Sequence, residues 1–226
     1  MSRSAEAVSR RRLWIEMAIL YGAIPAAVAL VAVGRPVLPV LWAAAIGCGI
    51  YLRRAGCRSA PLFFPGWKRV LSTVVARWLL GAGLMLAVLG VYRPDQLAVL
   101  PRNRPALWLL IVAFYPWISV VPQGVVYRAF FFHRYGALFS GERARWLAAA
   151  LVFSFSHVVF RNLWAVVWTL PAGWLFARTY RTTGSLGLSN LEHALYGTAL
   201  FTMGWGAWFF HGTPAAARAM LSPPSP

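Results

Sequence analysis

Long apolar runs divided by short, arginine-bearing loops fill most of this chain. Of its 226 residues, 60% are hydrophobic and only 12% are charged, whereas a soluble domain carries about 25% charged residues. A helix that crosses a bilayer needs ~20 predominantly apolar residues, and several of the runs approach or reach that length. The chain is therefore predicted to be all-α, folded as a polytopic transmembrane helix bundle.

The apolar runs predict about seven helices. Pro122 is expected to start a new helical segment directly after the fourth run, because the first position of a helix tolerates the missing N–H of proline. Pro171 is expected to interrupt the sixth helix. The predicted helices span residues 13–33, 37–52, 70–92, 106–121, 145–160, 162–180 and 186–210.

The basic residues predict an orientation. The chain has 22 Lys and Arg against 5 Asp and Glu, a formal net charge of +17. In a soluble chain this balance would indicate nucleic acid. Here the arginines lie in loops between apolar runs, where they orient helices and contact anionic lipid headgroups. We expect an N-in, C-out multi-pass protein of the inner or plasma membrane, with membrane lipids as partners and no nucleic acid.

The domain organisation follows from the same pattern, with no internal repeat and no second domain. A basic cytoplasmic N-terminus over residues 1–12 precedes the first three helices and their loops, over residues 13–105. A helical core covers residues 106–210, and a Pro/Ser-rich flexible tail covers residues 211–226. The first apolar run is long for a signal peptide, so it is expected to be a retained helix.

Two arginines lie within or beside apolar runs. Arg128 follows a long apolar helix, and an arginine in hydrocarbon costs roughly 2.5–3.5 kcal/mol unless it faces a polar interior or water. The alternative is that Arg128 snorkels to the interface. Arg77 lies near the end of its predicted helix, where snorkelling is expected. The polar residues that flank Arg128 favour a functional site around it.

Two further helices carry ionisable groups. Phe153 and His157 are four residues apart and share a helical face, and Glu192 stands beside His193. Each histidine alone is as readily a packing residue, but intramembrane groups of this kind face the bundle interior and pair with one another. A common polar site could activate water with carboxylate and imidazole, hold zinc through His157 and His193, or relay protons. No HExxH spacing is present.

Three short motifs give these residues a family context. The chain resembles the CPBP family, the CAAX proteases and bacteriocin-processing membrane proteins also called the abortive-infection family. The signatures of that family are EExxxR, FxxxH and Hxxx(N/D), on three different transmembrane helices. The counterparts here, within a resemblance over about residues 107–210, are Gln123-Gly124-x-x-x-Arg128, Phe153-x-x-x-His157 and His193-x-x-x-Gly197.

The departures from the motifs determine the predicted roles. The family resemblance implies a glutamate base where this chain has Gln123, which cannot take a proton. Gly197 replaces an Asn or Asp that stabilises an oxyanion or orients another group. Glu192 is the candidate replacement base, acting with His157, while His193 helps to stabilise the oxyanion. The predicted site residues are Glu192, His157 and His193 as catalytic groups, with Gln123, Arg128 and Asn162 in support.

The resemblance implies a function of the same kind. The predicted function is that of a CPBP- or CAAX-type intramembrane endopeptidase, a hydrolase that cleaves a membrane-associated or lipidated peptide or the membrane-sorting tail of a protein. The alternative is a catalytically inactive family member that acts as a membrane scaffold or binding protein. The sequence requires no metal, although zinc through His157 and His193 stays open.

Overall fold

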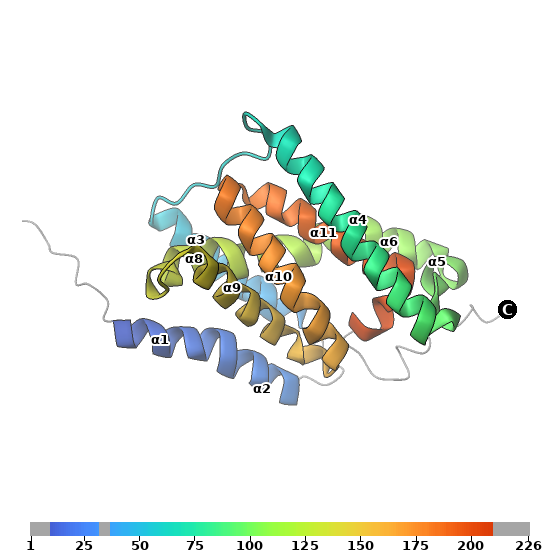
Figure 1. The fold of residues 1–226 in the computed structure, drawn as a ribbon. Helices are drawn as coiled ribbons and strands as arrows, with labels where there is room; N and C mark the ends of the chain where they lie inside the picture. The colour runs from blue at the N-terminus through green and yellow to red at the C-terminus, as the bar shows by residue number, and fades with distance from the viewer. Residues whose placement is uncertain (1–9, 32–36, 210–226) are drawn as a thin grey trace, which may run out of the picture.

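The computed structural model of this chain describes residues 10–31 and 37–209 (Figure 1). Within those ranges the chain is helical apart from its connections, and no strand is present, so the all-α prediction is confirmed. The predicted tail over residues 211–226 lies outside the described residues, as does most of the predicted N-terminal segment over residues 1–12.

The helices occupy the positions that the apolar runs predict, with one short addition, α5, in the loop before the family motifs. The expectation that Pro171 interrupts the sixth helix is wrong, because residues 163–183 form one continuous helix. Short π- and 3-10 turns join or extend several of them. The α-helices are α1 (Arg10–Ala18), α2 (Ile24–Val31), α3 (Leu38–Arg54), α4 (Trp67–Tyr92), α5 (Val99–Asn103), α6 (Pro105–Tyr115), α7 (Val121–Gly124), α8 (Phe131–Tyr135), α9 (Glu142–Ser156), α10 (Leu163–Thr183) and α11 (Leu186–Met203).

Among the described residues, three helical stretches are long and apolar enough to cross a membrane: Arg10–Val31, Trp67–Tyr92 and Pro105–Leu138. Their outward faces carry large apolar side chains that a soluble protein would bury, such as Leu30, Leu80 and Trp117. These features identify an integral membrane protein. The N-in, C-out orientation stays a prediction.

The helix that begins at Pro105 does not break at Pro122, so the predicted start of a new helix there is wrong. It continues to Leu138 through π-helical turns over Pro116–Val120 and Val125–Phe130. Pro122 has no N–H to offer the carbonyl of Ile118, four residues earlier. The indole N–H of Trp42 on α3 donates to that carbonyl instead, at 2.9 Å. A neighbouring helix thus replaces the missing bond, which is how membrane helices tolerate proline.

The bundle places the three family motifs in its interior. Helices α9, α10 and α11 lie side by side in its middle, with α1 and α2 along one side and α4 along the opposite side (Figure 1). Helix α11 contacts α4, α6 and α10, and α2 contacts the turn that ends α9. An aromatic cluster that includes Tyr21, Phe131 and Tyr135 packs α8 and the preceding π-turn against the first helix.

One carboxylate ties the first helix to this core. Glu16 accepts two hydrogen bonds from the Arg134 guanidinium, at 2.8 and 2.7 Å, and a third from the Tyr135 hydroxyl at 2.7 Å. Both charged side chains are largely buried, with 27% of Glu16 and 18% of Arg134 exposed. A bidentate, partly buried pair of this kind stabilises a structure more than an exposed ion pair does.

We expect Glu16→Gln to destabilise the protein by about 1–3 kcal/mol, because charge-assisted hydrogen bonds to Arg134 and Tyr135 are lost. Thermal unfolding of the detergent-purified chain measures the change. The matched control is Asp95→Asn, whose pair with Arg93 is 58% and 51% exposed and should leave the unfolding temperature unchanged. Equal unfolding temperatures for wild type and Glu16→Gln would contradict this role.

Candidate active site

The three motifs meet around the ring of Phe153 on α9. The centroid of this ring lies 4.7 Å from that of His157 and 5.3 Å from that of His193 on α11. The guanidinium carbon of Arg128, in the second π-turn of the long helix, lies 5.8 Å from the same centroid. The structure therefore brings Arg128, His157 and His193 together, although they lie far apart in the sequence.

Arg128 is buried in the bundle, with 2% of its surface exposed, so the snorkelling alternative is wrong. Its Nη2 donates to Asn190 Oδ1 at 3.3 Å and to His193 Nδ1 at 3.1 Å. The ring of Phe176 lies 5.4 Å from its guanidinium carbon and adds a cation–π contact. Among the described residues, no carboxylate forms an ion pair with Arg128.

The contact with Arg128 determines the tautomer of His193. A guanidinium has only donors, so Nδ1 of His193 must be the acceptor and the ring proton must lie on Nε2. That Nε2 lies 3.3 Å from the hydroxyl oxygen of Tyr115 on α6, and it therefore donates to this oxygen. Both ring nitrogens of His193 are occupied, so neither is open to take a proton from water.

His157 has the opposite arrangement. Its Nδ1 lies 2.8 Å from the backbone carbonyl oxygen of Phe153, which can only accept, so Nδ1 carries the proton. The lone pair of His157 is therefore on Nε2. This residue lines a large cavity, so of the two motif histidines it is the one with an open acceptor nitrogen.

The cavity has a volume of about 1060 Å³ and runs between α2, α3, the long helix and the end of α11. Leucine, isoleucine, valine and phenylalanine side chains form most of its wall. The polar wall includes Tyr115, Gln123 and His157, and the amide of Gln123 donates to Ser119 Oγ at 2.7 Å. Within the described residues, no Asp or Glu lines this cavity.

Two glycines stand where the family has side chains, and other residues fill the space above them. A Cβ at Gly124 would overlap the side-chain amide of Asn190, which instead bonds Arg128. A Cβ at Gly197 would overlap the hydroxyl end of Tyr115. Asn190 and Tyr115 therefore occupy the positions that the second glutamate and the Asn or Asp of the motifs would take.

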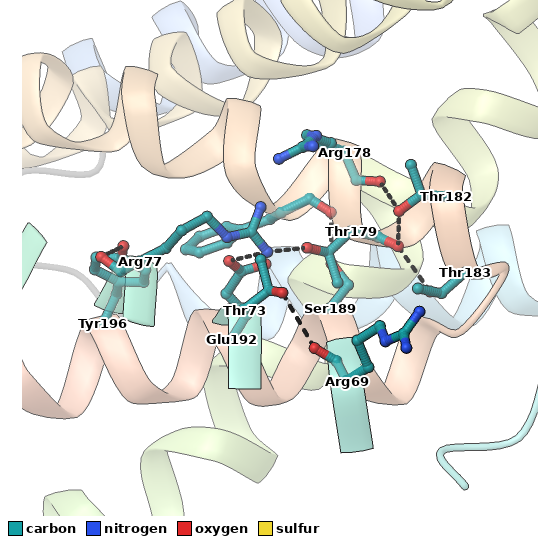
Figure 2. Close-up of polar contacts among 11 residues, drawn as sticks. Arg69, Thr73, Arg77, Arg178, Thr179, Thr182, Thr183, Ser189, Glu192 and Tyr196 are labelled. Atoms are coloured by element: carbon teal, nitrogen blue, oxygen red, sulfur yellow. Dashed lines mark hydrogen bonds and ion pairs between the residues drawn. The ribbon is translucent and has the colours of Figure 1, made fainter. Parts of the chain in front are cut away.

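Glu192 points to a different part of the bundle. It is fully buried between α4, α10 and α11, and its Oε1 lies 3.0 Å from Nη2 of Arg77 (Figure 2). The same Nη2 donates to Thr179 Oγ1 at 2.9 Å, and the Tyr196 hydroxyl donates to the backbone carbonyl of Arg77 at 2.8 Å. Arg77 is 17% exposed and paired, so the expectation that it snorkels is wrong. Adjacent residues on a helix point about 100° apart, which separates Glu192 from His193.

Asn162 is placed at the start of α10, where its side chain accepts a hydrogen bond from the Trp164 N–H at 2.9 Å. This is the bond of a helix N-cap. Asn162 is not among the residues that line the cavity.

Sequence reasoning missed Tyr115, Asn190 and the pairing of Arg77. The two glycines in the motifs were the available signal, because an interior glycine leaves room that some other side chain must fill.

A zinc site through His157 and His193 does not fit these donors. His193 has both ring nitrogens engaged, one by Arg128 and one by Tyr115. A guanidinium beside a ligand nitrogen also disfavours a second cation there. Across the residues that the structure describes, no three His, Cys, Asp or Glu side chains gather as metal ligands usually do.

Comparison with known proteins supports the family resemblance. Residues 105–199 match the family model described as type II CAAX prenyl endopeptidase Rce1-like. No curated protein matches the chain, and no solved structure matches it. The matched segment contains Arg128, His157 and His193. Residues 105–199 of this integral membrane protein are therefore similar to the Rce1-like endopeptidases, in agreement with the CPBP resemblance of the three motifs.

Proposed function

We propose that this chain is a CPBP-type intramembrane endopeptidase that hydrolyses a peptide bond in a membrane-associated peptide or protein tail, with His157 as the base that activates water. The observation that carries this proposal is that His157 lines a large apolar cavity and that its Nδ1 is bonded to a carbonyl, which leaves the lone pair on Nε2. A general base must have a free lone pair within reach of the attacking water. His157 meets this requirement and His193 does not.

The reaction needs only groups at the cavity wall. Nε2 of His157 takes a proton from water while the water oxygen bonds to the peptide carbonyl carbon. An N–H of the Gln123 amide stabilises the oxyanion, since this amide has a second N–H besides the one donated to Ser119. The C–N bond then breaks, and the His157 imidazolium returns the proton to the leaving amine.

The cavity wall defines the class of substrate. Its aliphatic and aromatic side chains suit an apolar segment or a lipid chain attached to a peptide, while His157 and Gln123 are among its few polar groups. A peptide embedded in the membrane could present its scissile bond there. We also propose that the arginine-rich loops contact anionic lipid headgroups, because of their positive charge.

The prediction that Glu192 is the base stays a prediction, but its contacts support a structural role. Glu192 is fully buried against Arg77, and a buried pair that loses one partner leaves an uncompensated charge. This pair joins α11, which carries His193, to α4. We therefore assign Glu192 and Arg77 to the positioning of α11 rather than to the chemistry.

A second candidate function is favoured by one observation: the described wall of the cavity has no carboxylate. The family resemblance implies a glutamate base, and here Gln123 occupies its position. In this alternative the chain binds an apolar peptide or lipidated tail in the cavity without cleaving it, as a membrane scaffold or binding protein.

Terminal-peptide mass spectrometry of membranes from cells with and without this chain tests the two functions. We expect new protein termini to depend on the wild-type chain and His157→Gln to lower their rate of appearance by about 10²–10⁴-fold, the usual contribution of a general base. Absence of chain-dependent termini, together with cross-linking of an uncleaved tail in the cavity, would favour the binding function.

Variants at Glu192 separate chemistry from positioning. The double variant Arg77→Gln/Glu192→Gln removes both charges together, so it avoids an unpaired buried charge. We expect it to retain cleavage when the rate is divided by the amount of protein in the membrane. Loss of cleavage at an unchanged protein level would return the base assignment to Glu192.

Gln123→Glu is expected to increase cleavage, because it adds a carboxylate acceptor to the wall of the cavity that His157 also lines. Gln123→Ala removes the amide donor and should lower cleavage. Both are measured as rates of appearance of the same termini, normalised to protein level. A Gln123→Glu variant no faster than Gln123→Ala would contradict the placement of the reacting carbonyl beside this residue.

A further inference from the structure

We infer that Tyr115 supplies the oxyanion donor that the third motif lacks at Gly197. This inference rests on the endopeptidase function proposed above and adds to it a residue outside all three motifs.

Tyr115 occupies the space that a side chain at residue 197 would need. A Cβ built at Gly197 would overlap Cε1, Cζ and the hydroxyl oxygen of Tyr115. The Tyr115 ring is held by Phe201, with centroids 5.6 Å apart, and by His193, with centroids 6.2 Å apart. Tyr115 also lines the cavity that contains His157. Its hydroxyl therefore lies where an Asn or Asp at residue 197 would begin.

The direction of the bonds leaves the hydroxyl proton of Tyr115 free. His193 accepts from Arg128 at Nδ1, so its only proton is on Nε2 and points to the Tyr115 oxygen. A phenol oxygen that accepts this bond keeps its own O–H for another acceptor. The Tyr115 O–H has no other partner among the described contacts, and the cavity offers the space for a substrate oxygen.

The far end of this chain of bonds carries a positive charge. Arg128 is buried, and among the described residues it forms no ion pair. Its donation to His193 polarises the Nε2–H, which in turn polarises the Tyr115 O–H, because linked hydrogen bonds strengthen one another. A negative charge that develops at the cavity end of the chain is thus stabilised by a fixed cation in a low-dielectric interior.

The test is cleavage by the full-length chain in its membrane, measured as the rate of appearance of chain-dependent termini. Tyr115→Phe keeps the ring over Gly197 and removes only the hydroxyl. We expect a fall of about 10²–10³-fold, the cost of removing one oxyanion donor, at an unchanged protein level. Tyr127→Phe is the matched control, since Tyr127 also lines the cavity but lies outside the chain of hydrogen bonds from Arg128 to Tyr115, and it should lower the rate far less than Tyr115→Phe does.

A rescue variant tests the shared space. Gly197→Asn alone should lose activity, because its side chain overlaps Tyr115. In the double variant Gly197→Asn/Tyr115→Ala the overlap is removed, so its cleavage rate should exceed that of Tyr115→Ala at least tenfold, as expected for two coupled positions. If Tyr115→Phe cleaves at the wild-type rate while His157→Gln does not cleave, this inference is overturned and the proposed function stands. If the wild-type chain yields no termini, the proposed function fails and this inference fails with it.

Discussion

The candidate active site depends on a buried arginine that is held without a carboxylate. Arg128 is 2% exposed inside a membrane bundle, where an unsatisfied cation is costly. Its guanidinium is stabilised by two hydrogen bonds, to the side-chain oxygen of Asn190 and to one nitrogen of His193. Cation–π contacts with the rings of Phe153 and Phe176 add to them. Because a guanidinium can only donate, this arrangement forces His193 into one tautomer and makes it a donor toward Tyr115. The chemistry available in the cavity follows from that constraint.

The site is a rearranged version of the family pattern. Glycine at residues 124 and 197 removes two polar side chains, and Asn190 and Tyr115 enter the space that they leave. The second glutamate of the motif would stand four residues before Arg128, the spacing at which side chains meet on a helix. Here Asn190 provides a neutral acceptor instead, so among the described residues Arg128 has no carboxylate in direct contact. Its positive charge favours an anion at the end of the hydrogen-bond chain through His193 and Tyr115, and the proposed function assigns proton transfer to His157.

Sequence patterns predicted the all-helical membrane fold, because apolar length is a local property. The tendency of intramembrane polar groups to face the interior and pair predicted a common site for Arg128, His157 and His193. These patterns did not predict the continuity of the long helix through Pro122, since that depends on Trp42 from another helix. They did not predict that Glu192 pairs with Arg77 and points away from His193, since adjacent residues lie about 100° apart on a helix. Its partner, Arg77, lies more than a hundred residues away and is fixed only by tertiary packing.

The tautomers of the two motif histidines provide the most direct test of this account, since they can be measured without a substrate. Nitrogen-15 NMR of the histidine-labelled protein in detergent, assigned with His157→Gln and His193→Gln, reports which ring nitrogen carries the proton. The account predicts opposite tautomers, with the proton on Nε2 in His193 and on Nδ1 in His157. A proton on Nδ1 of His193 would mean that Arg128 does not bond it, and both the hydrogen-bond chain to Tyr115 and the assignment of His157 as the one available base would then be wrong.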